Sequence, residues 1–313
     1  MDEGKEVLLS LRGVEVAFGG RGHRFLAVDD VSFDIYRGET FGLVGESGSG
    51  KTTLGRAIVR INQTSRGDII FEGEKINGKI PRELNSKLVQ RIQMIFQDPM
   101  ASLNERAKVD YIVSEGLMNV KKGLSEAERR RLVAEAMREV GLPAEFADRF
   151  PHEFSGGQRQ RIGIARSLIM KPSLVIADEP VSALDVSIRA QVLNLLAGLQ
   201  KKNRLTYLFI AHDLSVVRFI SDRVAVIRKG KIVELAGTEQ LFAYPLHPYT
   251  KALLSAVPVP NPVLAKKRQP KLYDPACHDY SADKPVWAEI ERGHFVYGNE
   301  KELAGYRREL AGR

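Results

Sequence analysis

The sequence predicts an α/β fold with a parallel sheet, and three features of the chain support this prediction. A glycine-rich loop at 45–53 follows an apolar run at 41–44 and leads into a helix. Between 173 and 227, runs rich in Val, Ile and Leu alternate with helical stretches, which is typical of a parallel sheet covered on both faces. A helical block from 101 to about 168 interrupts this pattern. We therefore expect an α/β core that carries an inserted helical subdomain.

The N-terminal part is predicted to form a small β subdomain with antiparallel strands. Residues 7–18 and 27–35 show the alternation of apolar and polar residues typical of half-buried strands, with a loop rich in Gly and Arg between them. The helix that leaves the glycine-rich loop continues from 54 to 61. A hairpin strand is expected at 67–73 and a further strand at 92–96.

The second half of the chain alternates helices and strands. In the helical block the clearest helix spans 124–140, with Ser125 as its N-cap and Gly141 as its end. Strands are then expected at 173–177, 205–210 and 224–227, and helices at 190–200 and 214–220. Beyond Pro245 the chain is rich in proline, which predicts an extended arm followed by a small appended module.

Length and composition narrow the class of protein. The 313 residues allow one large domain or two small ones, and 43% of them are hydrophobic, enough for a sizeable core. The single cysteine, Cys277, excludes an intrachain disulfide and a C-x-x-C metal site, and it suits a reducing compartment. No stretch approaches the roughly 20 apolar residues that span a bilayer, and the charged N-terminus does not resemble a signal peptide. We expect a protein that is soluble by itself and cytoplasmic.

The chain carries a net charge of +8, which leaves three interpretations open: nucleic-acid binding, docking at an anionic membrane, or a dispersed solubilising charge. The basic run at 129–131 lies in a helical stretch with interspersed glutamates, which favours a solvated helix face. The run at 266–268 precedes Pro270 and is expected to be an exposed linker. Because no aromatic residues accompany either run, the charge alone makes a poor case for nucleic acid.

The glycine-rich loop predicts a site for a nucleoside triphosphate. It fits the pattern G-x-x-x-x-G-K-[ST] between a strand and a helix, which a simple Gly/Ser turn would not explain. Its glycines allow a tight turn with inward-pointing N–H groups, and the helix adds its positive N-terminal end. We expect Lys51 to reach the β- and γ-phosphates and Thr52 to place a hydroxyl on Mg²⁺. The predicted nucleotide-binding residues are Gly45, Glu46, Ser47, Gly48, Ser49, Gly50, Lys51, Thr52 and Thr53.

Two acidic residues end the predicted strand at 173–177, at the edge of an α/β sheet where ligands bind. Asp178 is predicted to hold Mg²⁺, directly or through water, and Glu179 to take a proton from an attacking water. The other interpretation, an acidic surface turn, leaves the core-like strand before it unexplained.

A second glycine-containing segment, Ser155-Gly156-Gly157-Gln158, opens a helix. By itself such a segment is more often an ordinary helix cap. Together with the phosphate loop and the acidic strand end, it resembles the signature Leu-Ser-Gly-Gly-Gln of the ATP-binding cassette (ABC) ATPases, with Phe154 in place of the leucine. The resemblance implies a P-loop NTPase core of the ABC type, with ATP and Mg²⁺ as its cofactors.

The resemblance also assigns further residues. Gln97 matches the glutamine of the Q-loop, which serves metal binding and catalysis, and His212 matches the switch histidine. Asp185 lies in the segment Ser182-Ala183-Leu184-Asp185, which matches the D-loop. Phe18 is similar to the aromatic residue that stacks on adenine, although a half-buried strand residue is the other interpretation. The family further implies a head-to-tail dimer, with ATP between Lys51 of one subunit and Ser155 of the other.

Two segments resemble importers of the oligopeptide/dipeptide permease group, at 96–104 and 244–254, and the segment at 155–164 is closest to their second ATPase subunit. The resemblance implies an ABC ATPase domain over 1–262, with the helical subdomain at about 99–168, and a C-terminal extension over 263–313. It also implies two membrane permease subunits, a second ABC ATPase subunit and, indirectly, an extracytoplasmic solute-binding protein as partners. The chain would then lie at the cytoplasmic face of the membrane. The cargo stays open among peptides, nickel chelates and oligosaccharides.

The C-terminal module departs from the family at one point. Many relatives carry a cysteine cluster there, but here Cys277 stands alone, so an iron–sulfur cluster is not expected. His278 and His294 are expected to be structural residues, and a metal site that they form with Cys277 is the other interpretation.

Two other functions compete with transport. A soluble ABC ATPase acting on nucleic acid or ribosomes is the alternative, but the sequence has no second cassette and no long coiled-coil or zinc insertion. A regulatory module without turnover is disfavoured because Gln97, Glu179 and His212 are all present.

Overall fold

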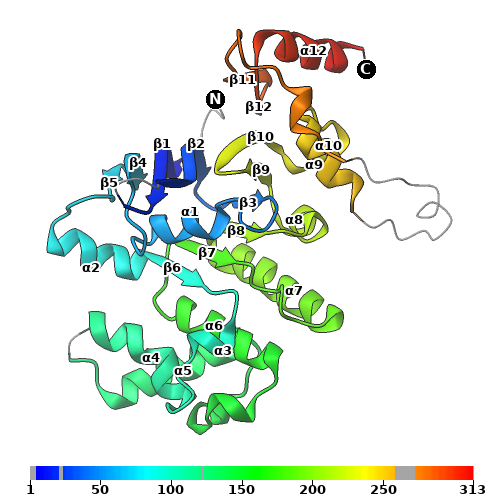
Figure 1. Ribbon diagram of the computed structural model, residues 1–313. Coiled ribbons are helices and arrows are strands. Elements are labelled where there is room, and N and C mark those ends of the chain that lie inside the picture. Colours follow the sequence, from blue (N-terminus) through cyan, green and yellow to red (C-terminus); the bar gives the residue numbers. More distant parts are fainter. Residues whose placement is uncertain (1–4, 21–23, 122, 258–271, 313) are drawn as a thin grey trace.

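A sheet of eight strands organises the protein, as the computed structural model shows for residues 5–20, 24–121, 123–257 and 272–312. The strand order is β11-β12-β10-β9-β3-β8-β7-β6 (Figure 1). Strands β9, β3, β8, β7 and β6 are parallel, and β10, β12 and β11 extend the sheet in antiparallel fashion. The parallel strands are β3 (Thr40–Val44), β6 (Ile92–Ile95), β7 (Leu174–Asp178), β8 (Thr206–Ala211) and β9 (Arg223–Arg228). The predicted parallel α/β core is confirmed.

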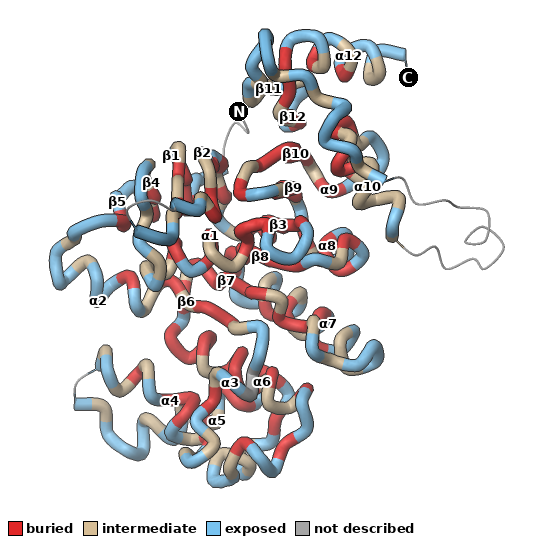
Figure 2. Tube along the Cα trace, viewed as in Figure 1, coloured by how far each residue is buried: buried red, intermediate tan, exposed pale blue. Residues whose placement is uncertain are grey.

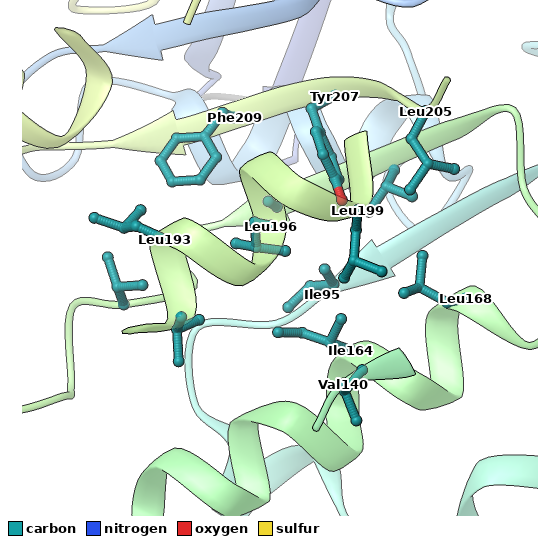
Figure 3. Packing of buried hydrophobic residues seen from close by; sticks show 14 of the residues in the cluster. Ile95, Val140, Ile164, Leu168, Leu193, Leu196, Leu199, Leu205, Tyr207 and Phe209 are labelled. Carbon is teal, nitrogen blue, oxygen red and sulfur yellow. The ribbon is translucent and has the colours of Figure 1, made fainter. Parts of the chain in front are cut away.

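The central strands are apolar throughout because the two faces of the sheet enter two different cores. Alternate residues of a strand point to opposite faces. In β8, Tyr207 and Phe209 pack with helices α6 (Gly156–Leu168) and α7 (Val186–Asn203), as Figure 3 shows. The next residues along the strand, Leu208 and Ile210, pack on the other side with helix α1 (Lys51–Ile58) and the N-terminal sheet. The buried tube segments in Figure 2 follow these strands through the centre of the molecule.

The N-terminal subdomain is a separate antiparallel sheet with the strand order β2-β1-β4-β5. Its strands are β1 (Val7–Phe18), β2 (Phe25–Tyr36), β4 (Arg66–Phe71) and β5 (Glu74–Lys75). Helix α2 (Arg82–Arg91), for which no prediction was made, then leads into β6. The predicted antiparallel subdomain is confirmed, and the predicted strand at 7–18 has the observed bounds.

The inserted block is helical and extends from the edge of the sheet formed by β6 (Figure 1). It contains α3 (Pro99–Ser102), α4 (Val109–Val120), α5 (Glu126–Glu139), the 3₁₀ turns Ala144–Asp148 and Pro151–Glu153, and α6. The α5 helix begins as predicted, because the Ser125 side chain accepts a hydrogen bond from the Glu128 N–H. The arginines of the basic run on α5 each pair with a carboxylate: Arg129 with Asp110, Arg130 with Glu126 and Arg131 with Glu135. Arg130 and Arg131 are exposed, in agreement with the predicted solvated helix face, but the Arg129 side chain is only 16% exposed and lies against Asp110 of α4.

The C-terminal part continues the central sheet. It comprises α8 (Leu214–Ile220), β10 (Lys231–Gly237), α9 (Thr238–Ala243), α10 (Pro248–Ser255), the 3₁₀ turn Pro275–Cys277, β11 (Val286–Glu291), β12 (His294–Gly298) and α12 (Glu300–Ala311). The extended arm predicted beyond Pro245 is wrong for residues 248–255, which are helical. The reason is that Pro248 occupies the first helical position, where its missing N–H costs nothing.

Two predictions lie outside the described residues. The basic run at 266–268 and the boundary at 262 between the ATPase domain and the C-terminal extension both fall within 258–271. Among the described helices, none combines the length and the apolar composition needed to cross a bilayer.

Candidate nucleotide-binding and hydrolysis site

A cavity of about 850 Å³ lies where the carboxyl ends of three parallel strands meet. All residues of the loop 45–53 line it, together with Gln97, Glu179 and His212. The register explains this meeting, because Val44 at the end of β3 pairs with Ala211 at the end of β8, and Ile210 pairs with Asp178 at the end of β7. The loops that follow these strands therefore open onto the same edge of the sheet.

The lysine of the loop is held by the loop backbone. Lys51 Nζ donates to the carbonyl oxygens of Gly45 and Glu46, both at 2.8 Å, which points the ammonium group into the curve of the loop. Burial lowers the pKa of Lys51, and the nearby carboxylates of Glu179 and Asp178 act in the opposite direction. A buried ammonium group whose hydrogen bonds go to the neutral oxygens of Gly45, Glu46 and Ser49 gains from an anionic ligand.

Two glycines of the loop occupy positions where no other residue fits. A Cβ at Gly45 would lie 2.2 Å from the Ile227 carbonyl oxygen of β9. Gly50 has φ +104°, in the left-handed region, and a Cβ there would lie 2.2 Å from the Ala27 carbonyl oxygen. The loop therefore lies directly on the neighbouring backbone and forms a narrow cradle, as a phosphate-binding loop requires.

Thr52 and Asp178 place two oxygen ligands side by side. The Thr52 hydroxyl donates to Asp178 Oδ1 at 2.9 Å. Burial raises the pKa of Asp178, the hydrogen bond from Thr52 lowers it, and the charge of Glu179 raises it again. A buried carboxylate next to a hydroxyl is the type of donor set that Mg²⁺ uses in nucleotide sites, so the residues present fit this ion.

Glu179 turns away from the strand that carries it. Its φ of +46° lies in the left-handed region, which is uncommon for a residue other than glycine and costs about 1–3 kcal/mol. Its N–H donates to the Ile210 carbonyl oxygen at 2.9 Å, which anchors this conformation to β8. Strand β7 therefore ends at the buried Asp178, while the next side chain enters the cavity.

Gln97 and His212 both contact the carboxylate of Glu179. Gln97 Nε2 donates to Glu179 Oε2 at 3.1 Å, and His212 Nδ1 lies 3.0 Å from the same oxygen. Three residues from distant parts of the chain, each predicted for catalysis, are thus brought together at one point. The other imidazole nitrogen of His212, Nε2, does not take part in this contact.

Phe18 lies at the rim of the cavity, where it has a neighbour that the sequence analysis missed. Phe18 pairs with Phe25 across the β1–β2 hairpin, so both side chains lie on the same face of the sheet. Both residues line the cavity and are exposed. An aromatic residue at the start of the second strand, opposite Phe18, was the available signal for Phe25.

The predicted signature segment does not line this cavity. Ser155 instead caps α6: its Oγ accepts from Gln158 N at 3.4 Å, and its N–H donates to Gln158 Oε1 at 2.9 Å. Ser155, Gly156 and Asp185 are exposed, and Asp185 is the residue before α7. Gly157 is buried against Ile188 of α7, with no room for a Cβ, and Phe154 packs edge-on against Phe146 in the helical block. The helix start is therefore intact and takes no part in lining the cavity formed by this chain's own loop.

The structure assigns hydrogen-bond partners to the two C-terminal histidines. His294 Nε2 lies 2.8 Å from Glu234 Oε1, both residues being fully buried, and His278 Nδ1 lies 2.5 Å from Glu302 Oε1. Cys277 is exposed. Within the described part of the chain, no cluster of His, Cys, Asp and Glu is arranged to hold a metal ion.

The phosphate cradle, the acidic strand end and the helical insertion together define an ATPase of the cassette type. The model of the ABC transporter family matches residues 28–182, and the model of the oligopeptide/dipeptide transporter C-terminal region matches 233–282. The chain belongs to the family of ABC transporter ATP-binding proteins. Members of this family bind ATP and hydrolyse it to power transport, and this chain is an ATP hydrolase of that kind.

Curated relatives match the chain over nearly its whole length. The oligopeptide transport ATP-binding protein AmiF of Streptococcus pneumoniae is 63% identical over 97% of this chain and 99% of its own. OppF of Bacillus subtilis, with the same description, is 50% identical over 96% of this chain and 99% of its own. The dipeptide transport ATP-binding protein DppF of Lactococcus lactis is 50% identical over 98% of this chain and 99% of its own.

Solved structures of cassettes have the same fold. The ATP-binding cassette MJ0796, solved as a dimer in a post-hydrolysis state with ADP and Pi, aligns with a TM-score of 0.67 at 28% identity, over 74% of this chain and 99% of its own. CbiO1 of Clostridium perfringens, part of the ABC transporter complex cbiONQ, aligns with a TM-score of 0.67 at 30% identity. The alignment covers 76% of this chain and 92% of CbiO1.

Proposed function

We propose that this chain is the second ATPase subunit of an importer that takes up oligopeptides or similar small solutes. The observation that carries the proposal is the full-length similarity to AmiF and OppF, in a chain whose cavity contains Lys51, Gln97, Glu179 and His212. The chain would work with two membrane permease subunits, a second ATPase subunit and an extracytoplasmic solute-binding protein. Docking on the permeases would hold it at the cytoplasmic face of the membrane.

In the proposed mechanism, the residues of the cavity have separate roles. Lys51 and the loop 45–53 bind the phosphates, while Phe18 contacts the adenine. Thr52, Asp178 and Gln97 would hold Mg²⁺, which would supply positive charge beside the phosphate oxygens. Glu179 takes the proton from the attacking water, and the contacts from Gln97 and His212 keep its carboxylate at the mouth of the loop.

The second half of each site would come from a facing cassette. The helix start at Ser155 and Gly156 is exposed and supports this, because its N–H groups and positive helix end suit an anion that this chain's own cavity does not bring to it. The dimeric structures of MJ0796 support the same arrangement. Asp185 would lie at the contact between the two cassettes. Closure would then depend on ATP, because ATP contacts both halves.

A groove of about 370 Å³ is the proposed contact for a permease. It lies between the core and the helical block, where residues of α1, α2, β6 and α4 meet beside Phe96. Val89 and Ile61 are exposed at this groove, and Arg166 contributes a cation to it. Arg60 and Glu115 also line the groove, so it combines apolar side chains with charges of both signs, which suits a short protein segment that carries apolar and polar groups. Phe96 lines the groove, and the next residue, Gln97, lines the nucleotide cavity, so a permease seated in the groove would act on the hydrolysis site through this one loop.

The domain division is part of the proposal. We propose an ATPase domain over 1–262, with its helical subdomain at about 99–168, and a C-terminal extension over 263–313. The ABC transporter model ends at 182, and the C-terminal model, which matches 233–282, spans the proposed boundary.

Reconstitution tests the function. The chain, its permeases and the second ATPase are placed in proteoliposomes with ATP on the cassette side, and uptake of a labelled oligopeptide is measured. Wild-type uptake is expected, with none for Glu179→Gln. Val89→Glu should block assembly while ATP binding persists, and Val286→Glu, at a similarly exposed valine of β11, should assemble normally. Failure to assemble with permeases, together with salt-sensitive duplex binding at physiological ionic strength, would favour the nucleic-acid alternative instead.

A further inference from the structure

A tyrosine from the C-terminal region reaches the phosphate loop. Tyr249 is the second residue of α10, lies 203 residues after Glu46 and is only 1% exposed. Its hydroxyl accepts a hydrogen bond from the Glu46 N–H at 3.2 Å. The Glu46 carbonyl oxygen, at the other end of the residue, accepts from Lys51 Nζ at 2.8 Å. The first turn of the phosphate loop is therefore held from outside by Tyr249 and from inside by Lys51.

The position of Tyr249 is itself fixed by buried contacts. The backbone N–H of Tyr249 donates to the imidazole Nδ1 of His247. The backbone N–H of His247 in turn donates to the buried carboxylate of Glu234 at 3.0 Å. The Tyr249 ring packs edge-on against Tyr273, with centroids 5.4 Å apart. The Arg228 guanidinium lies over both rings, 5.6 Å from the centroid of Tyr249 and 4.4 Å from that of Tyr273. The hydroxyl consequently has little freedom to leave the loop.

The hydroxyl also keeps its proton at physiological pH. Burial is the first cause that raises the pKa of Tyr249 to about 12. A neutral hydroxyl accepts the Glu46 N–H without placing a negative charge next to the phosphate site. The interaction is thus compatible with an anionic ligand a few residues along the same loop.

We propose that Tyr249 is a positioning residue for the phosphate loop, and that through it the C-terminal region of the chain sets the affinity for the nucleotide phosphates. Because Tyr249 takes the Glu46 N–H, the first peptide of the loop has one orientation before the nucleotide arrives. A loop that is already ordered pays less entropy on binding. The residue lies within the segment that matches the oligopeptide/dipeptide transporter C-terminal region, so this segment acquires a role in nucleotide binding. The inference rests on the proposed assignment of the loop to the phosphates.

The chain offers a matched control for a test of this role. Tyr207 is also 1% exposed and lies in the same hydrophobic cluster as Tyr249. Its hydroxyl has no hydrogen-bond partner among the residues that the structure describes. Tyr249→Phe and Tyr207→Phe therefore make the same chemical change in similar surroundings, but only the first removes a contact with the loop.

The dissociation constant for ATP is measured by calorimetry, and KM and kcat by phosphate release. Tyr249→Phe is expected to weaken ATP binding about three- to tenfold, the loss of one net hydrogen bond, and to raise KM similarly with kcat within twofold. Tyr207→Phe should bind ATP within twofold of wild type. The melting temperature of each variant is measured without nucleotide, so that a general loss of stability is separated from a loss of positioning.

Two results would overturn the inference: unchanged ATP affinity in Tyr249→Phe, or an equal loss in both variants. Lys51→Ala separates this failure from a failure of the proposed function. If Lys51→Ala binds ATP like wild type, the phosphate-loop assignment itself is wrong. If Lys51→Ala loses binding while Tyr249→Phe keeps it, only the role of Tyr249 is refuted.

Discussion

Replacing Glu179 by Gln tests the proposed general base directly. In the wild type, Gln97 and His212 both contact Oε2 of Glu179. A glutamine has nearly the same shape and still presents one oxygen to these two residues, but it has no negative charge and cannot accept a proton from water. The substitution thus preserves the local geometry and removes only the basic group.

The expected size of the effect follows from these contacts. A positioned general base contributes about 10²–10⁴-fold to a rate, which corresponds to about 3–5 kcal/mol in the activation free energy. ATP binding should be equal or tighter, because a carboxylate near an anionic ligand is removed while Lys51 keeps its contacts to the loop. We therefore expect Glu179→Gln to bind ATP normally, to accumulate as a closed dimer and to release phosphate at least a hundredfold more slowly.

The assay uses the purified chain, alone and with its partner ATPase, over a range of protein concentrations. Phosphate release gives the rate, calorimetry gives the ATP affinity, and light scattering gives the oligomeric state with and without ATP. Glu126→Gln is the control, since Glu126 forms an exposed i,i+4 pair with Arg130 on α5 and should change the rate by less than twofold. Phosphate release by Glu179→Gln within threefold of wild type would refute the assignment of Glu179 as the base.

Two further predictions concern the metal and the C-terminal region. Thr52→Val removes the hydroxyl that lies 2.9 Å from Asp178 Oδ1. The Mg²⁺ concentration for half-maximal hydrolysis should therefore rise about tenfold, while ATP binding measured in EDTA stays the same. An unchanged Mg²⁺ dependence would exclude Thr52 as a ligand. Burial, then the charges of His278, Arg228 and Lys251, lower the pKa of His247 from 6.5 to about 3. The folded state therefore binds fewer protons than the unfolded state, so this contribution to stability is complete above pH 6.5 and falls as the pH decreases. At pH 5 the loss amounts to about 2 kcal/mol. His247→Asn keeps a capping acceptor for α10 but has no imidazole to protonate. The free energy of unfolding of this variant should therefore change by about 2 kcal/mol less between pH 7 and pH 5 than that of the wild type. Equal pH profiles of the two proteins in urea titrations would contradict this account.

Much of the fold was predictable because local patterns and tertiary packing agree in this chain. The alternation of apolar and polar residues in 7–18 predicts a strand with one face in the core, and the continuous apolar run of β7 predicts a strand buried on both faces. The phosphate loop was predictable for a similar reason. Its glycines are required by contacts with the neighbouring backbone, such as that between Gly45 and Ile227, so spacing alone identifies it.

Contacts between distant segments were not predictable in the same way. The hydrogen bond between Tyr249 and Glu46 joins residues 203 positions apart. Nothing in the sequence around either residue indicates that the two are in contact. The helix at 248–255 was missed because proline was counted as a breaker, whereas Pro248 at the first helical position starts a helix. The attachment of β12 to β10 depends on the pairing of Glu234 with Val296 and on the buried contact between Glu234 Oε1 and His294 Nε2. A single sequence contains no local pattern for such pairings.

The geometry of one chain also argues that its hydrolytic site is a half-site. Asp178 ends strand β7, and Lys51, Thr52, Glu179 and His212 follow strands whose carboxyl ends share the same edge of the sheet, so the fold of this chain alone assembles them. The helix start at Ser155 belongs to the inserted block, and its capping box is complete without any contact to the loop at 45–53. A positively polarised and exposed helix end is stabilised further only by an anion brought from elsewhere. The anion available in the proposed mechanism is the nucleotide held by a second cassette, so the site that folds completely within this chain would function only when it is shared.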